Sequence, residues 1–181
     1  MRARVVRIRV AVCITDGDRI LLVQHVKKGH RYWLVPGGGV EVGETLVAAA
    51  ERELREETGY EVAIGRLLLV AESLEPRGRH LVNLVFAGSI LGGALRPGCD
   101  GRLVDAGWEP IDDLATLEMY PPIGEEVLRC CREGQTGEVR VLGNVWREWA
   151  GESDAAGEGR ASPRRLRPRR VSSRRAQEGE Q

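Results

Sequence analysis

Residues 38–60 read GGVEVGETLVAAAERELREETGY, and this stretch decides the fold of the chain. A glycine turn, 37–39, begins just before it and gives the backbone close access to a metal or a phosphate, because no side chain stands in the way. Residues 45–58 are strong helix formers, with Thr45 placed as an N-cap and Gly59 as a C-terminal stop. The stretch therefore predicts a glycine turn that leads into a helix.

Three carboxylates of this predicted helix fall on one face. Glu53, Glu56 and Glu57 are spaced i, i+3, i+4, and like charges at that spacing repel one another. Such a face needs a cation or basic partners to offset the repulsion. Arg52 is one partner, since it lies four residues before Glu56 and is placed to reach back towards Glu44. The buried stripe of the helix is predicted from apolar residues four apart: Leu46, Ala50 and Leu54.

A solvated, glutamate-rich surface is the ordinary meaning of such a run of charge. A surface helix, however, does not require three glycines before it, an isolated Glu44 at its start, or a glutamate pair closed by Gly59. The whole pattern resembles the Nudix box, G-x5-E-x7-R-E-U-x-E-E-x-G-U with U an apolar residue. The matching positions are Gly38, Glu44, Arg52, Glu53, Leu54, Glu56, Glu57, Gly59 and Tyr60. Only Tyr60 is not a plain aliphatic residue at a U position.

The resemblance to the Nudix hydrolase superfamily, of MutT-like type, implies a fold. We expect an α/β (α+β) domain, a mixed β-sheet packed between helices, within residues 1–150 and with its core at about residues 3–135. Strands are expected at 6–14, 20–26, 62–71, 81–91 and 102–108, with a short helix opening at 112 and a longer one after 122. The alternation at 6–14 indicates a half-buried strand, which a turn at Asp16-Gly17 joins to 20–26 as a hairpin. The nearly continuous apolar run at 81–91 indicates a central strand.

The resemblance also implies a chemistry. Hydrolysis of a diphosphate bond requires neutralised phosphate oxygens and a water placed in line with the leaving oxygen. Clustered carboxylates favour Mg²⁺ or Mn²⁺. By resemblance, Glu53, Glu56 and Glu57 are the metal ligands, and Glu56 or Glu57 is the base in the box. Glu44 and Arg52 would orient the ligands, while Gly37, Gly38 and Gly39 would approach the metal or phosphate.

Residues outside the box leave several alternatives open. The basic loop 27–31, with Arg31, reads either as a phosphate-contacting lip or as a solvated turn. Trp33 either stacks on a base or belongs to the core. Some members of the family take their base from a later glutamate, and the candidates here are Glu75, Glu109 and Glu118. Pro76 lies 16 residues beyond Tyr60, which resembles the ADP-ribose pyrophosphatase subgroup, although an ordinary loop proline is the favoured interpretation.

The box does not separate the substrates of the family, which include ADP-ribose, dinucleoside polyphosphates, nucleotide sugars and damaged nucleoside triphosphates. Three hypotheses follow. The first is a metal-dependent hydrolase of a nucleoside diphosphate linked to another group, ADP-ribose-like or a sanitising triphosphate pyrophosphatase. The second is a nucleotide-binding module without turnover, which loss of box carboxylates would indicate and their presence here disfavours. The third is an RNA-end hydrolase that uses a basic tail.

Composition bounds the remaining possibilities. The 181 residues hold 27 Lys plus Arg and 27 Asp plus Glu, so net charge gives no general attraction to nucleic acid or membrane. Residues 151–181 carry eight Arg and few apolar residues, which predicts a disordered tail, solvated rather than RNA-binding. The four cysteines lack CxxC spacing, which favours a reduced, cytoplasmic setting. We expect no membrane span and a nucleotide-derived small-molecule substrate. The oligomeric state stays open, with a homodimer as one alternative.

Overall fold

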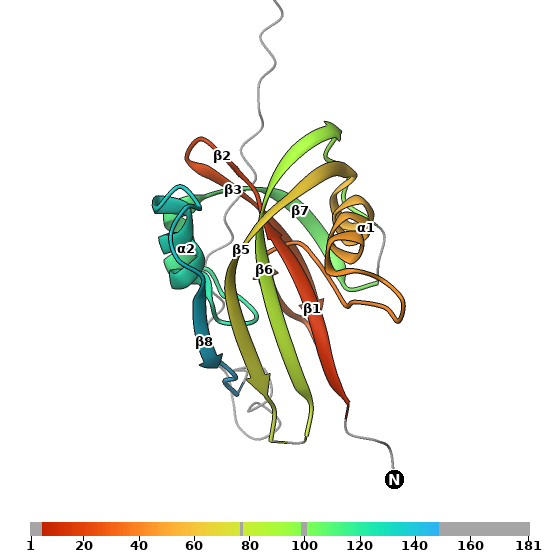
Figure 1. Cartoon of the computed structure of the whole chain (residues 1–181), viewed down its shortest axis with the longest axis vertical. Helices are drawn as coiled ribbons and strands as arrows, with labels where there is room; N and C mark the ends of the chain where they lie inside the picture. The colour runs from red at the N-terminus through yellow and green to blue at the C-terminus, as the bar shows by residue number, and fades with distance from the viewer. Residues whose placement is uncertain (1–4, 77, 99–100, 149–181) are drawn as a thin grey trace, which may run out of the picture.

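The computed structural model describes residues 5–76, 78–98 and 101–148 (Figure 1). Its elements, in chain order, are β1 (Val6–Cys13), β2 (Thr15–Asp16), β3 (Arg19–Lys27), β4 (His30–Leu34), α1 (Leu46–Thr58), β5 (Tyr60–Leu74), β6 (His80–Gly93), β7 (Leu103–Pro110), a 3-10 helix (Ile111–Ala115), α2 (Gly124–Arg132) and β8 (Arg140–Asn144). The tail predicted at 151–181 lies outside the described residues. No described helix is both long enough and apolar enough to cross a membrane.

The strands form two four-stranded sheets. The first has the order β1-β6-β5-β8 and is mixed, because β1 runs parallel to β6 and β8 parallel to β5, while β5 and β6 are antiparallel. The second is antiparallel and built on β3, which pairs with β2, β4 and β7. The predicted α/β class with a mixed sheet is therefore confirmed, and the strands divide between two sheets.

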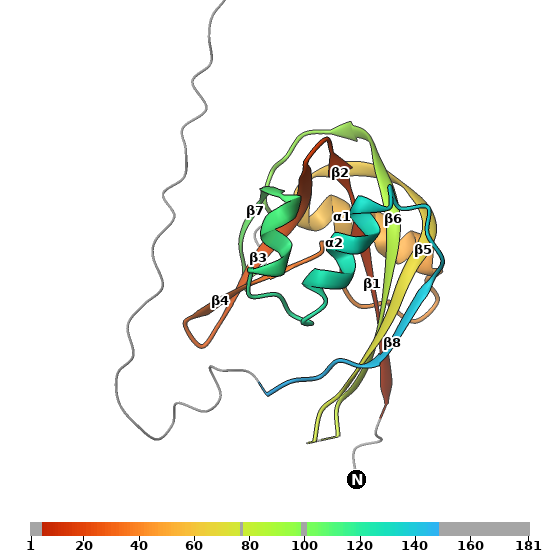
Figure 2. The ribbon, with the colours of Figure 1, turned by 90° about the vertical axis from the view of Figure 1, so that its left-hand side faces the viewer.

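The two helices lie on opposite sides of the strands, α1 on one side and α2 on the other (Figures 1 and 2). Because successive side chains of a strand point to opposite faces, alternate residues of β1 enter two different cores. The core under α1 contains Val10, Val12, Leu21, Ala50 and Leu54. The core under α2 contains Ala11, Cys13, Leu22, Val85 and Val127. The sheets thus lie between helices, as predicted.

Two strand predictions need correction. The strand expected at 6–14 is not half-buried along its length: its first three residues are exposed and its last four are buried on both faces. The hairpin at Asp16-Gly17 forms, but through β2 and β3, since β1 pairs with β6 instead. The pairing of Val6 with His80 joins residues far apart in sequence, which alternation alone does not reveal. The central place of β6, between β1 and β5, is confirmed.

Candidate functional site

Helix α1 begins and ends where the sequence predicts. The Thr45 hydroxyl accepts a hydrogen bond from the Ala48 amide at 3.1 Å, and Gly59 adopts a left-handed conformation with φ 75°. The predicted stripe is right at Ala50 and Leu54, which are fully buried, and wrong at Leu46, which is 36% exposed. The face towards the strands runs instead through the following buried positions: Ala49, Ala50, Leu54, Glu57 and Thr58. This face brings one glutamate of the box into the interior.

Arg52 joins the other box carboxylates. Its Nε donates to Glu44 Oε1 at 2.7 Å and its Nη2 to Glu44 Oε2 at 2.9 Å, a bidentate pair of the kind that fixes both groups. Its Nη1 donates to Glu53 at 2.9 Å and to Glu56 at 3.4 Å, and its Nη2 also donates to the Gly39 carbonyl at 3.1 Å. The predicted contact between Arg52 and Glu44 is confirmed. One guanidinium therefore ties the start of the helix, its acidic face and the glycine turn together.

Glu57 is set apart from Glu53 and Glu56. The Gly37 amide donates to Glu57 Oε2 at 2.7 Å, and His25 Nε2 lies 3.5 Å from Glu57 Oε1. Glu57 is buried, whereas the Glu56 side chain is 60% exposed. The three glutamates thus share one helix face but differ in surroundings: Glu57 meets the turn and β3, Glu53 meets Arg52, and Glu56 faces solvent.

The glycine turn requires glycine at two positions. Gly37 has φ 143°, and a Cβ there would overlap the Val10 carbonyl oxygen. A Cβ on Gly38 would overlap the carboxylate of Glu53, so the absence of a side chain is what lets this backbone lie against the acidic face. The turn is also held to β1, because the Val10 amide donates to the Gly38 carbonyl at 3.0 Å.

Arg9, on β1, donates hydrogen bonds to the backbone at the glycine turn. Its Nη2 donates to the carbonyl oxygens of Val35 at 2.9 Å and Gly37 at 2.8 Å. Burial lowers the pKa of Arg9, and the nearby charges of Glu57 and Glu53 act against that shift. Sequence reasoning did not single out Arg9. Its position next to Val10, the first buried residue of β1, is the signal that it faces the interior.

Arg52 and burial shift the pKa values of the carboxyl groups in the site in opposite directions. The hydrogen bonds from Arg52 lower the pKa of Glu44 to about 2, with the Glu41 amide adding to the shift. The same contacts raise the pKa of Arg52, with the Glu44 hydrogen bond as the largest cause. Burial raises the pKa of Glu53; Arg52 opposes this shift, while Glu57 and Glu56 add to it. The acidic face is therefore only partly neutralised by its arginine.

The donor set fits a divalent cation by its chemistry. Carboxylate oxygens are the ligands that Mg²⁺ and Mn²⁺ prefer. Burial is the main cause of the raised pKa of Glu53, and the neighbouring charges of Glu57 and Glu56 add to it. Within residues 5–76, 78–98 and 101–148, no three acidic, histidine or cysteine side chains converge as they stand to hold an ion. The residues that would hold one are Glu53, Glu56 and Glu57.

A row of side chains leads away from Glu57, and we call Glu57, His25, Tyr32, Tyr120 and Glu75 the contact row. The His25 and Tyr32 rings meet edge to face at 5.9 Å between centroids, as do Tyr32 and Tyr120. The Tyr120 hydroxyl then donates to Glu75 Oε1 at 3.3 Å. The four members beyond Glu57 come from β3, β4, the segment before α2 and the β5–β6 turn. Sequence reasoning missed His25, Tyr32 and Tyr120, because no spacing along the chain brings them together.

The structure does not bring Trp33 and Arg31 to the acidic face. Trp33 is partly buried and packs against the core under α2. Of the two alternatives for Trp33, stacking on a base or packing in the core, the structure shows the second. The Arg31 Nη1 donates to Gln24 Oε1 at 2.9 Å in exposed surroundings. Both residues alternate with Tyr32 along β4, so they point to the opposite face from the contact row. A role for loop 27–31 in phosphate contact stays a prediction.

The three later glutamates lie in different places. Glu109 pairs with Ile20 across β7 and β3, and Ile20 belongs to the core under α2, on the face opposite α1. Glu118 is exposed, and its carbonyl accepts from the Trp33 amide at 2.8 Å. Glu75 ends the contact row. Which residue is the base stays a prediction, and the structure places only Glu56 and Glu57 in the acidic face itself.

Comparison with known proteins agrees with this geometry. The model of the NUDIX domain matches residues 5–130. The 8-oxo-dGDP phosphatase NUDT18 of Homo sapiens is 35% identical over 119 residues, which cover 64% of this chain and 36% of that protein. The ADP-ribose pyrophosphatase of Methanocaldococcus jannaschii is 37% identical over 92 residues, 49% of this chain and 54% of that protein. The matched part of the chain thus spans about a third to a half of these relatives.

Solved structures give the same answer at the level of the fold. An ADP-ribose pyrophosphatase from Streptococcus suis 89-1591 superposes with a TM-score of 0.58 at 26% identity, covering 75% of this chain and 98% of that one. The matched domain, residues 5–130, includes the box, the glycine turn and the contact row. The chain therefore belongs to the NUDIX domain family.

Proposed function

We propose that this chain hydrolyses a diphosphate linkage in a nucleoside diphosphate joined to a second group, with Mg²⁺ or Mn²⁺ bound by Glu53, Glu56 and Glu57. The observation that carries the proposal is the arrangement around Arg52, whose guanidinium contacts Glu44, Glu53 and Glu56 at once. A bound divalent ion would polarise the phosphoryl oxygens and lower the pKa of a bound water.

The residues of the chain supply the remaining parts. Arg52 holds Glu44 and Glu53 in place, and the Gly37 amide holds Glu57. The Gly37-Gly38 backbone, which has no side chain to exclude a ligand, lies beside the Glu53 carboxylate. Glu56 is the most exposed of the three carboxylates and is thus the one open to a water, so we assign it proton acceptance.

For the substrate we favour an ADP-ribose-like compound. The support is the naming of relatives from Methanocaldococcus jannaschii and Streptococcus suis as ADP-ribose pyrophosphatases, together with Pro76 beyond the box. An oxidised nucleoside diphosphate is the second candidate, which the likeness to human NUDT18 favours.

The test is a substrate panel with a matched pair of variants. ADP-ribose, a dinucleoside polyphosphate, a nucleotide sugar, 8-oxo-dGDP and 8-oxo-dGTP are each incubated with Mg²⁺, Mn²⁺ or EDTA, and products are separated by chromatography. We expect metal-dependent turnover that falls at least about 100-fold in Glu56→Gln, while Glu51→Gln, on the same helix but outside the box pattern, retains it. Full turnover by a folded Glu56→Gln protein would remove the role of Glu56.

A further inference from the structure

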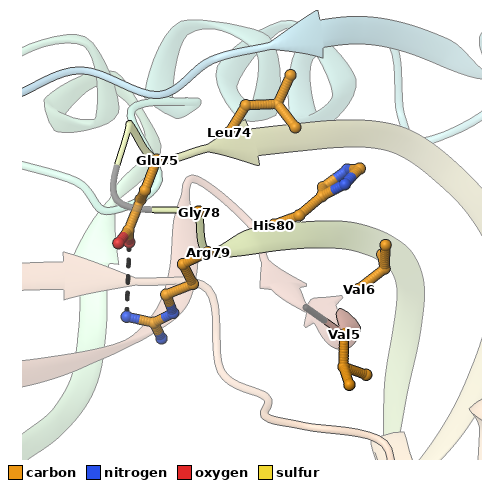
Figure 3. A pocket seen from close by; sticks show the side chains of 7 residues that line it. All are labelled: Val5, Val6, Leu74, Glu75, Gly78, Arg79 and His80. Carbon is orange, nitrogen blue, oxygen red and sulfur yellow. Dashed lines mark ion pairs between the residues drawn. The ribbon is translucent and has the colours of Figure 1, made fainter. Parts of the chain in front are cut away.

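The contact row ends at a pocket outside the box. The pocket has a volume of about 240 Å³ and lies at the β5–β6 turn, beside the start of β1 (Figure 3). Glu75 belongs to both features, since it lines the pocket and accepts the Tyr120 hydroxyl of the row. A continuous line of side chains therefore connects this pocket to Glu57.

The walls of the pocket differ in chemistry. Val5, Val6 and Leu74 form an apolar side, and each is more than 40% exposed. Glu75 and Arg79 form a polar side, with Arg79 Nη1 3.5 Å from Glu75 Oε1 (Figure 3). A ligand that fits both sides offers hydroxyl groups on one face and carbon atoms on the other, as a sugar ring does.

The charge of the pocket selects against a phosphate. Arg79 pairs with Glu75, and His80, which also lines the pocket, lies 3.0 Å from Glu72 Oε2. Each basic side chain of the lining thus already has an acidic partner, and the Glu75 carboxylate repels an anion. A carboxylate accepts hydrogen bonds from neighbouring hydroxyls, and an arginine donates to their oxygens. Burial raises the pKa of both Tyr32 and Tyr120, so their hydroxyls are neutral along the row at pH 7.

We propose that this pocket binds the second group of the substrate, a neutral hydroxyl-bearing sugar, when the diphosphate lies at the box. The proposal rests on the proposed function and narrows it. Val6 at the pocket and Arg9, which bridges Gly39 of the glycine turn, are three residues apart on β1, roughly 10 Å at about 3.3 Å per residue. A substrate with two ends, a nucleoside diphosphate joined to a sugar, is long enough to extend from the box to the pocket. A nucleoside diphosphate or triphosphate has no such second group and uses only the box end.

The experiment compares ADP-ribose with 8-oxo-dGDP in wild type, Glu75→Gln and Arg79→Met. Glu61→Gln is the matched control, because Glu61 is an exposed glutamate at the start of β5, the strand that ends just before Glu75. We expect Glu75→Gln to lower kcat/KM for ADP-ribose about tenfold more than that for 8-oxo-dGDP, mainly through KM, since a hydrogen bond to a charged group is lost. Arg79→Met should change the same ratio in the same direction, and Glu61→Gln should leave it at the wild-type value. Circular dichroism melts verify that each variant is folded.

Three results would overturn the inference. A fall in kcat of equal size for both substrates would assign Glu75 to general catalysis or to structure. That outcome is the one expected if Glu75 is the catalytic base. If the ratio of kcat/KM for ADP-ribose to that for 8-oxo-dGDP is unchanged in both variants, the pocket does not bind the second group of the substrate. Wild-type turnover of 8-oxo-dGDP without turnover of ADP-ribose would refute the sugar pocket while the hydrolase proposal stands. Failure of the proposed function is distinct, because wild type would then hydrolyse neither substrate with Mg²⁺ or Mn²⁺.

Discussion

The box and the contact row are built in opposite ways. The box residues lie within one turn and one helix, and their contacts with one another and with the glycine turn join residues no more than 20 positions apart, as from Gly37 to Glu57. Beyond Glu57, which belongs to both features, the contact row gathers residues from four parts of the chain, such as Tyr120 and Glu75, which are 45 residues apart. A local motif places the proposed catalytic groups, whereas long-range packing places the groups that we propose meet the rest of the substrate.

Gly38→Ala gives the largest effect and breaks the box without touching its carboxylates. The new Cβ would overlap the Glu53 carboxylate and displace it from Arg52. Because a shift of about 1 Å at a reacting centre costs about 100-fold in rate, we expect a loss of that size in kcat/KM. Gly39→Ala is the control, since its Cβ meets only Arg7 Nη2 at 3.6 Å. Equal losses in the two variants would show that the overlap with Glu53 is not the cause.

Arg52→Lys tests whether geometry or charge holds the box together. Lysine keeps the positive charge but lacks the planar fork that contacts Glu44 with two nitrogens. Loss of a group that orients metal ligands typically costs about 10- to 100-fold, and we expect turnover to fall within that range. Arg55→Lys, on the exposed side of α1, is the matched control. Wild-type turnover in Arg52→Lys would mean that charge alone suffices.

Tyr120→Phe sharpens the role of the contact row. The variant keeps the ring against Tyr32 but removes the hydroxyl that donates to Glu75. The hydroxyl acts on the substrate only through Glu75, so we expect about a fivefold fall in kcat/KM for ADP-ribose relative to 8-oxo-dGDP, smaller than the fall in Glu75→Gln. Steady-state kinetics with both substrates measures the ratio, with Tyr60→Phe, at the start of β5 and outside the contact row, as a control. A fall of the same size for both substrates would place Tyr120 in general support of the site.

Glu109→Gln gives the smallest effect and separates this glutamate from the site. Burial raises the pKa of Glu109, and Asp113 adds to the shift. The folded state then binds this proton more tightly than the unfolded state, so stability falls as pH rises from about 4.3 through the raised pKa. The variant lacks this titration and should lose less stability across that window, by less than about 1 kcal/mol because solvent screens a half-buried group.

Urea unfolding of wild type and Glu109→Gln at pH 4 and pH 7 measures the difference. Turnover measured alongside separates the stability effect from catalysis. A collapse of turnover in the folded variant would make Glu109 the base and contradict its place on the face opposite α1.

Sequence reasoning predicts the parts of this molecule that depend on neighbours in the chain. The caps Thr45 and Gly59 follow from local backbone chemistry, and the pair Arg52 and Glu44 follows from the box pattern. Leu46 is wrong because the buried face of α1 is set by the strands it packs on. His25 and Tyr32 could not be identified, because their neighbours across the row are fixed by the pairing of β3 with β4 and by the segment before α2.

The attachment of the glycine turn to β1 has a consequence for folding kinetics. Helix α1 is made by contacts between close neighbours and can form early, but loop closure delays pairings between distant segments. Residues 6–13 must first pair with 80–87 in β6 before the β1 edge is fixed to receive the turn through the amides of Val10 and Val12. We therefore expect the acidic helix to form ahead of the turn that completes it, and the site to be among the last parts of the described structure to assemble.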